Sequence, residues 1–132
     1  MKAAVATGDG VYEIDVDSEE ILDVDTALEL PDDAPPALAL PRVRAAAASG
    51  STIVAVVDAR PPLLVSHDAG RTWREAGGGL PRGVAVAVDS DNPDLVLYAS
   101  RNRLHVSQDG GRFWRSLSLE LPEITAVAWL ER

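Results

Sequence analysis

Three groups of residues in this sequence could do chemistry: two histidines, an acidic turn, and a motif of serine and aspartate that occurs twice. The acidic turn, residues 89–92, reads Asp-Ser-Asp-Asn and resembles the start of a calcium loop. It runs into Pro93 and lacks the glycine and final glutamate of such a loop, so a turn rich in Asp and Asn is the better interpretation. His67 and His105 have no Cys/His cluster and no serine or carboxylate at nucleophilic spacing. We therefore predict no metal, no cofactor and no catalytic residue.

The serine and aspartate motif occupies residues 66–73 and 107–114. Its specified positions are Ser66, Asp68, Gly70, Thr72 and Trp73 in the first copy, and Ser107, Asp109, Gly111 and Trp114 in the second, where Phe113 replaces the threonine. Apolar residues before each copy predict one strand, and the residues from the threonine position onward predict another. The aspartate can accept backbone N–H groups, the glycine can adopt positive φ, and the tryptophan can pack beneath the turn. Each residue type therefore has a structural role.

The motif is part of a longer repeat. Its two copies lie 41 positions apart, from Ser66 to Ser107, and the pair Leu-Pro recurs at residues 40–41, 80–81 and 121–122. A repeat of about 40–45 residues is typical of a four-stranded propeller blade. The spacing predicts an all-β protein built from blades of four antiparallel strands.

The motif closely resembles the Asp-box, or BNR, repeat of sialidases, sortilin-type receptors and photosystem assembly propellers. The first copy matches at every specified position, and the second departs only at Phe113. Residues 86–98 also look like the connection between the first two strands of a blade in those proteins. The resemblance implies a propeller in which these motifs lie on the outer rim, away from the ligand face. It implies a structural role for the nine motif residues and does not identify an activity.

A glycosidase is one activity to weigh, because sialidases carry this repeat on six blades. Such enzymes need a carboxylic acid with a carboxylate or tyrosine nucleophile, and sialidases hold the substrate carboxylate with three arginines. The candidates here are Arg42, Arg44, Arg82, Arg101 and Arg103, with Tyr12 or Tyr98 as the nucleophile. We cannot match them to a catalytic motif, and a twofold assembly would present every group twice. We expect a non-enzymatic protein.

Counting strands predicts the assembly. The expected strands are 3–6, 11–17, 21–25, 43–48, 52–58, 63–66, 72–76, 84–88, 95–100, 103–107, 113–117 and 124–130. Alanines at 45–48 could favour a helix, but the repeat aligns them with the strand at 84–88. The single domain then contains two complete blades, residues 41–80 and 81–122, and one blade split between residues 1–30 and 123–132.

Three blades are too few for a closed ring, since propellers typically have about 4–8. We expect a homodimeric six-bladed propeller in which the C-terminal strand of each chain is exchanged with the other. The alternatives are a three-bladed fragment, a lone three-blade sandwich, or docking onto a different partial propeller.

Composition limits the partners and the compartment. A net charge of −9 argues against nucleic acid and anionic membranes. Eleven arginines against one lysine, with many Asp, Ala and Val residues, favour a halophilic source, although a GC-rich genome would give a similar composition. With no cysteine, and with a charge too early for a signal peptide, we expect a cytoplasmic protein.

One loop interrupts the repeat. It is rich in proline and contains Pro31, Asp32, Asp33, Pro35 and Pro36, and prolines remove the N–H donors of a strand. This loop is our candidate for contact with a protein partner, although a long solvated connection between the split blade and the next one is the more ordinary interpretation. We expect a protein-interaction scaffold. The alternative is a propeller that binds a carbohydrate or another small ligand.

Overall fold

The computed structural model of the chain describes residues 1–26, 40 and 42–130. Within those residues the protein has twelve strands and no helix. The strands are β1 (Lys2–Thr7), β2 (Gly10–Asp15), β3 (Glu20–Asp25), β4 (Val43–Ser49), β5 (Thr52–Val57), β6 (Leu63–Ser66), β7 (Arg74–Ala76), β8 (Gly83–Val88), β9 (Val96–Ser100), β10 (Leu104–Ser107), β11 (Arg115–Ser116) and β12 (Ile124–Trp129). No described segment is a helix with the length and apolar character needed to cross a membrane.

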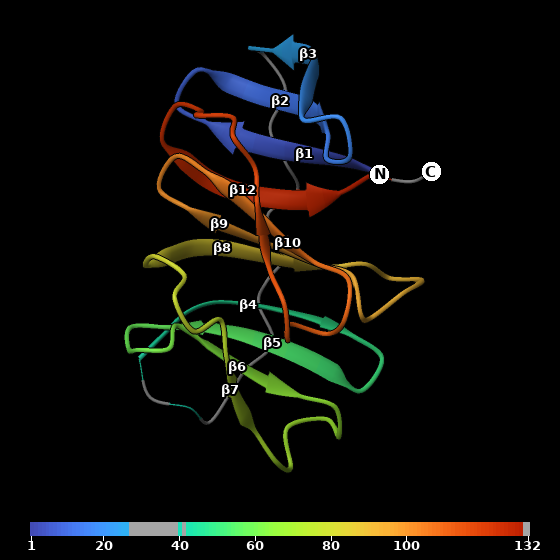
Figure 1. Ribbon diagram of the computed structural model, residues 1–132, viewed down its shortest axis with the longest axis vertical. Coiled ribbons are helices and arrows are strands. Elements are labelled where there is room, and N and C mark those ends of the chain that lie inside the picture. The colour runs from blue at the N-terminus through green and yellow to red at the C-terminus, as the bar shows by residue number, and fades with distance from the viewer. Residues whose placement is uncertain (27–39, 41, 131–132) are drawn as a thin grey trace.

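The strands form three four-stranded antiparallel sheets, as the repeat predicts. We call them the β4 sheet (β4-β5-β6-β7), the β8 sheet (β8-β9-β10-β11) and the split sheet (β12-β1-β2-β3). They stack with the β8 sheet between the other two (Figure 1). Strand β8 contacts β4 and β5 on one side and β12 on the other, whereas β4 and β12 do not contact each other. The three sheets therefore form an open arc.

Two apolar cores hold the arc together, one at each contact between sheets. Val54, Val56 and Tyr98 belong to the core between the β4 and β8 sheets. Ile14 and Leu97 belong to the core between the β8 sheet and the split sheet. Side chains alternate along each strand, so every sheet has two distinct faces. The β8 sheet buries both of its faces, because it has a neighbour on each side.

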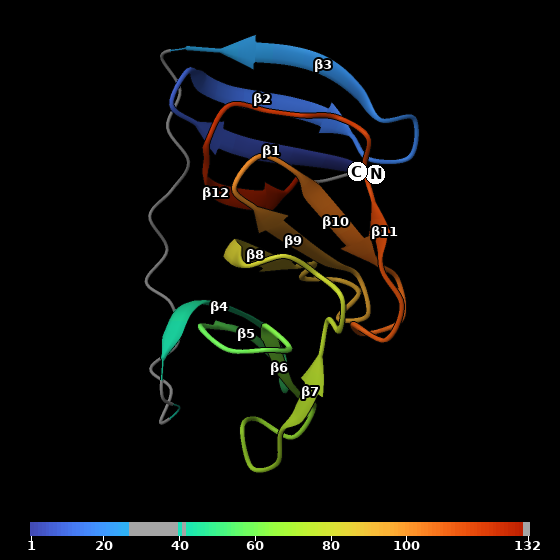
Figure 2. The same ribbon diagram turned by 60° about the vertical axis from the view of Figure 1, so that its left-hand side comes forward.

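The split sheet joins the two ends of the described chain (Figure 2). Strand β12 pairs with β1 from Ala3↔Trp129 to Thr7↔Ile124, and the N–H of Leu130 donates to the carbonyl of Lys2 at 2.9 Å. In this single chain, the C-terminal strand pairs with β1 of the same chain; its exchange with a second copy stays a prediction. One chain can complete this sheet because its two ends lie side by side.

The outermost strands of the two repeat sheets begin later than the sequence predicts. We expected them to start at the threonine position of each motif, but β7 begins at Arg74 and β11 at Arg115. The backbone N–H groups of Thr72 and Phe113 instead donate to the motif carboxylates, which keeps these residues in the turns. By contrast, the alanines at 45–48 do lie in strand β4, as the repeat register predicts. The residues of the proline-rich loop, 31–36, lie outside the described part of the chain.

Candidate functional site

The first serine and aspartate motif forms a closed hydrogen-bond network. The hydroxyl of Ser66 donates to Asp68 at 2.8 Å and accepts the N–H of Gly70 at 2.8 Å. Asp68 accepts both the N–H and the hydroxyl of Thr72. The indole N–H of Trp73 donates to the carbonyl of Gly70 at 3.1 Å. These bonds hold the turn between β6 and β7 in one conformation.

The second motif repeats this network, with the N–H of Arg112 donating to Asp109 at 3.1 Å in place of the threonine hydroxyl. Ser107 donates to Asp109 at 2.7 Å and accepts the N–H of Gly111 at 2.8 Å. Asp109 accepts the N–H of Phe113 at 3.0 Å, but phenylalanine has no hydroxyl to add. Trp114 donates to the carbonyl of Gly111 at 2.9 Å. The Phe113 side chain is 80% exposed, so this substitution places a large apolar group in solvent.

The two motif carboxylates are held in their ionised form. Hydrogen bonds from the Thr72 hydroxyl, the Thr72 N–H and the Ser66 hydroxyl lower the pKa of Asp68 to about 2. The N–H of Phe113, followed by the Ser107 hydroxyl, lowers the pKa of Asp109. A carboxylate in this position accepts hydrogen bonds and is poorly suited to donate a proton. The geometry therefore fits a structural role for both aspartates.

The two histidines have different surroundings. His67 is exposed, with Nδ1 3.2 Å from the hydroxyl of Thr52. His105 is buried on β10, with its two ring nitrogens 3.2 Å from Ser100 Oγ and 2.7 Å from Ser116 Oγ. Burial, with a smaller effect of Arg103, lowers the pKa of His105 to about 4. The buried ring is therefore neutral near pH 7 and bonded on both sides by hydroxyl groups.

Six of the ten described arginines lie at one end of the sheets. We call this the arginine-rich end; it lies where β4 and β8 begin and carries Arg42, Arg44, Arg60, Arg82, Arg101 and Arg103. Three of them make exposed ion pairs with N···O separations of 3.4 to 3.8 Å: Arg82–Asp58, Arg101–Glu123 and Arg103–Glu120. Pairs this exposed contribute about 0–1 kcal/mol. The other three arginines make no ion pair with any described residue.

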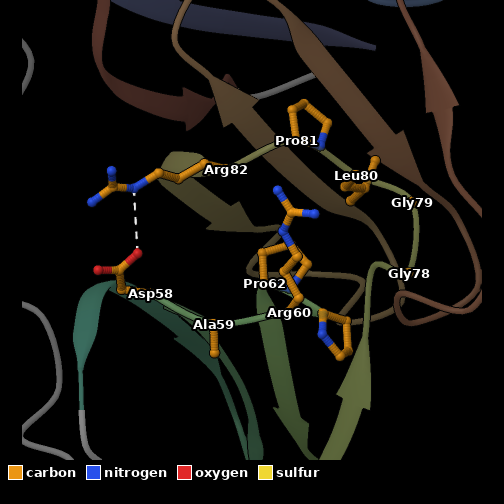
Figure 3. Close-up of a pocket in the computed structure, with 10 residues that line it drawn as sticks. Asp58, Ala59, Arg60, Pro62, Gly78, Gly79, Leu80, Pro81 and Arg82 are labelled. Carbon is orange, nitrogen blue, oxygen red and sulfur yellow. Dashed lines mark ion pairs between the residues drawn. The ribbon is translucent and has the colours of Figure 1, made fainter.

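A groove of about 940 Å³ opens at this end, between the β5–β6 loop and the segment that leads into β8. Its lining is Asp58, Ala59, Arg60, Pro61, Pro62, Gly78, Gly79, Leu80, Pro81 and Arg82. Figure 3 shows Arg60 extending from its loop toward Leu80 and Pro81, beside the pair formed by Arg82 and Asp58. Sequence reasoning missed Arg60. The signal was its place in the β5–β6 loop, which corresponds to the loop that carries Arg101 and Arg103 in the next repeat.

The tyrosines proposed as nucleophiles are not available at this groove. Tyr98 is fully buried, and its hydroxyl donates to the carbonyl of Pro81. Burial raises the pKa of Tyr98 to about 12. Tyr12 lies on β2 of the split sheet and packs against the core between that sheet and the β8 sheet. Arg44 is near enough to Tyr98 to oppose the rise in the pKa of that tyrosine slightly, but the buried hydroxyl is bonded to a backbone carbonyl and is not exposed at the groove.

The acidic turn at 89–92 connects β8 to β9. The Asn92 side chain accepts the N–H of Asp94 at 3.2 Å, and its carbonyl accepts the N–H of Leu95 at 3.0 Å. Across the described residues, no group of three His, Cys, Asp or Glu side chains is arranged to hold a metal ion.

The rim of the split sheet is a candidate surface besides the motif turns and the groove. Strand β3 is outermost in its sheet, and all six of its residues are exposed. Ile21, Leu22 and Val24 are 45%, 43% and 42% exposed, which is unusual for large apolar side chains on one short strand. The outermost strands of the other two sheets, β7 and β11, have only three and two residues.

Solved structures give the fold its context. The GH74 enzyme of Niastella koreensis matches 96% of this chain with a TM-score of 0.54 at 18% sequence identity. It is a propeller protein. The fold is that of β-propeller blades. This chain covers only 20% of that enzyme, so the likeness concerns the fold alone.

A second similar structure, YCF48 bound to a D1 peptide, matches 86% of this chain with a TM-score of 0.49 at 18% identity, and the match covers 34% of that chain. No protein-family model matches the sequence, and no curated protein does either. The motif turns, the groove at the arginine-rich end and strand β3 must therefore be judged on their own geometry.

Proposed function

We propose that this chain is a non-enzymatic propeller module that binds a protein partner and assembles as a homodimer of six sheets. The observation that carries the proposal is the exposed rim strand β3, with Ile21, Leu22 and Val24 in solvent. Proteins usually keep edge strands very short or cover them, because a free strand edge pairs with other chains. Strands β7 and β11 follow that rule, and β3 does not.

The neighbouring sheet leaves this strand uncovered. Ile21 and Val24 pair with Ile14 and Tyr12, and so they lie on the face of the split sheet that packs against the β8 sheet. Strand β11, the outermost strand of the β8 sheet, has two residues and is too short to extend over β3. The apolar side chains of β3 therefore form an exposed apolar surface beside the core between the β8 sheet and the split sheet.

The charges on β3 indicate the chemistry of the partner. Glu20 and Asp23 lie on the same strand as the apolar residues, and β3 has a neighbour on only one side. An extended segment that adds to such an edge gains main-chain hydrogen bonds and places its side chains next to those of the strand. The partner that fits is an extended segment with apolar residues next to lysine or arginine.

Peptide binding tests the proposal. Fluorescence anisotropy would compare a ten-residue peptide that alternates Val with Lys against one in which Ser replaces every Val. We expect the Val–Lys peptide to bind more tightly, and the double change Ile21→Ser with Val24→Ser to weaken its binding at least tenfold. Ser18→Ala, in the preceding turn, is the control and should bind as the wild type does. Equal binding of the two peptides, or wild-type affinity in the β3 variant, would contradict the proposal.

A second candidate function is supported by the groove at the arginine-rich end. Arg60 extends along the groove and makes no ion pair within the described residues, so a small ligand with a carboxylate could bind there. Thermal unfolding with a panel of small carboxylates tests this. A rise in melting temperature that Arg60→Ala removes, and that Arg71→Ala leaves intact, would support it. No rise with any carboxylate would exclude this class of ligand.

A further inference from the structure

The two outer sheets of the arc each have a face that no described strand covers. In the β4 sheet, Ala45, Ala47, Val54 and Val56 pack toward the β8 sheet, so residues of the opposite parity point away. We call these the β4 outer face: Ala46, Ala48, Ile53 and Leu64. In the split sheet, Val127 and Trp129 pack toward the β8 sheet. The split outer face points away and contains Ala6, Glu13, Ala126 and Ala128.

The split outer face has the residue pattern of a face that packs against another sheet. Each sheet has a β-bulge near the start of its innermost strand, which is β4, β8 or β12. Aligning the three bulges shows which residues of the three sheets are equivalent. In this alignment, the two positions that face the following sheet are alanine every time: Ala45 and Ala47, Ala85 and Ala87, Ala126 and Ala128. The first two pairs lie in or against the two inter-sheet cores. Small residues there permit close approach, and the third pair has no described sheet against it.

The first motif turn shows that the β4 outer face lacks a neighbour in the same way. A Cβ built on Gly111 would lie 3.6 Å from Val65 and 3.8 Å from Ala76, both in the β4 sheet, and Gly111 is buried. The equivalent Gly70 would meet only Trp73 and Ile53 of its own sheet, and it is partly exposed. The second motif is therefore covered by the preceding sheet, whereas no described sheet covers the first.

We propose that a second copy of this chain supplies the cover, with the β4 outer face of each copy packed against the split outer face of the other. The inference rests on the homodimer of the proposed function and names the surfaces that form it. A head-to-tail contact that closes by a twofold rotation gives a ring of six sheets, within the range of about 4–8 seen in propellers. The same two faces meet whether β12 pairs within its own chain or is exchanged between copies.

We call the contact between the β4 outer face of one copy and the split outer face of the other the seam. It differs electrostatically from the two contacts between sheets inside the chain. Arg74 and Arg115 each donate to a backbone carbonyl of the following sheet, those of Gly110 and Val16. The pairing registers place Asp23 at the equivalent position of the split sheet. The seam between copies therefore lacks this arginine contact, and each copy carries a net charge of −9. Salt should strengthen the assembly, because it screens repulsion between like-charged chains.

Light scattering with designed variants tests the seam. In molar NaCl the wild type should have a mass of roughly 28 kDa, twice the 14.0 kDa chain. Ala46→Arg on the β4 outer face and Ala128→Arg on the split outer face should each give 14.0 kDa. Ala59→Arg, an exposed alanine of the β5–β6 loop, is the matched control and should stay dimeric. Circular dichroism and thermal unfolding would check that every variant is folded.

Mixing the two monomeric variants tests the head-to-tail geometry. The Ala46→Arg chain keeps a native split outer face, and the Ala128→Arg chain keeps a native β4 outer face. One native seam can therefore form, and the mixture should recover a dimer that neither variant forms alone. If the wild type and both variants are dimeric, the proposed seam is wrong and the homodimer of the proposed function still stands. A wild type that is monomeric at every salt concentration would overturn both.

Discussion

Arg74 donates a hydrogen bond from Nη2 to the carbonyl oxygen of Gly110 at 2.6 Å, and so links β7 to the second motif turn in the neighbouring sheet. Arg115 makes the equivalent bond to Val16 of the split sheet at 2.9 Å. In both places the guanidinium crosses between two sheets at their outer rim. The motif turns thus do more than close a hairpin, because the second one also presents a carbonyl to the preceding sheet.

Removing this link should weaken the contact between the β4 and β8 sheets. We expect Arg74→Ala to lower the free energy of unfolding by about 1–2 kcal/mol, as loss of a partly buried hydrogen bond from a charged donor does. Arg71→Ala, an exposed arginine of the first motif turn, should change it by less than about 0.5 kcal/mol. Urea denaturation at fixed protein concentration measures both. Equal effects of the two substitutions would mean that the link contributes nothing specific.

The second motif should be improvable by restoring its missing hydroxyl. Phe113→Thr would give Asp109 the side-chain donor that Thr72 gives Asp68, and would remove an 80% exposed aromatic ring. We expect the melting temperature to rise by a few degrees. The converse change, Thr72→Phe, should lower it. Differential scanning calorimetry measures both, and a fall with Phe113→Thr would show that the ring contributes packing that outweighs the hydroxyl.

Stability should depend on pH in two separate windows. His105 has a folded-state pKa of about 4 against an ordinary value of 6.5, so between these values the unfolded state binds a proton that the folded state does not. The free energy of unfolding should therefore fall as the pH decreases from 6.5 to 4. Asp68, with a folded-state pKa of about 2 against 3.8, adds a further loss as the pH decreases from 3.8 to 2.

His105→Gln separates these windows. It should flatten the dependence between pH 4 and 6.5 and leave the loss below pH 4 unchanged. Urea denaturation at closely spaced pH values, with protein and salt concentrations held fixed, would show the two slopes. An unchanged slope between pH 4 and 6.5 in this variant would mean that another group is responsible.

An engineered disulfide can distinguish pairing of β12 within one chain from exchange. Ala4 and Ala128 are directly opposite on β1 and β12, and the chain has no other cysteine. Opposite residues on antiparallel strands have Cα atoms about 4.5–5.5 Å apart, within the range that a disulfide spans. We expect the oxidised double variant Ala4→Cys, Ala128→Cys to run as a single chain on a non-reducing denaturing gel. A covalent dimer would show that the strand is exchanged.

The repeat register explains why so much of the fold could be predicted from the sequence. The spacing of the Leu-Pro pairs and of the two motifs gives the number of residues in each four-stranded sheet. The alternation of side chains along the strands then predicts which residues share a face. This was enough to override the helical preference of the alanines at 45–48, which lie in β4. The starts of β7 and β11 were wrong, because hydrogen bonds of Thr72 and Phe113 to the motif carboxylates compete with strand pairing.

By itself, the sequence determined the blade-like unit and its number, because hydrophobic alternation and turn chemistry are local and recur with the repeat. Only the tertiary structure decided which surfaces are left over. The burial of His105, the position of Arg60 in its groove and the exposure of β3 depend on which sheet lies next to which and on the length of its outer strand. These are contacts between distant segments, and no local pattern encodes them.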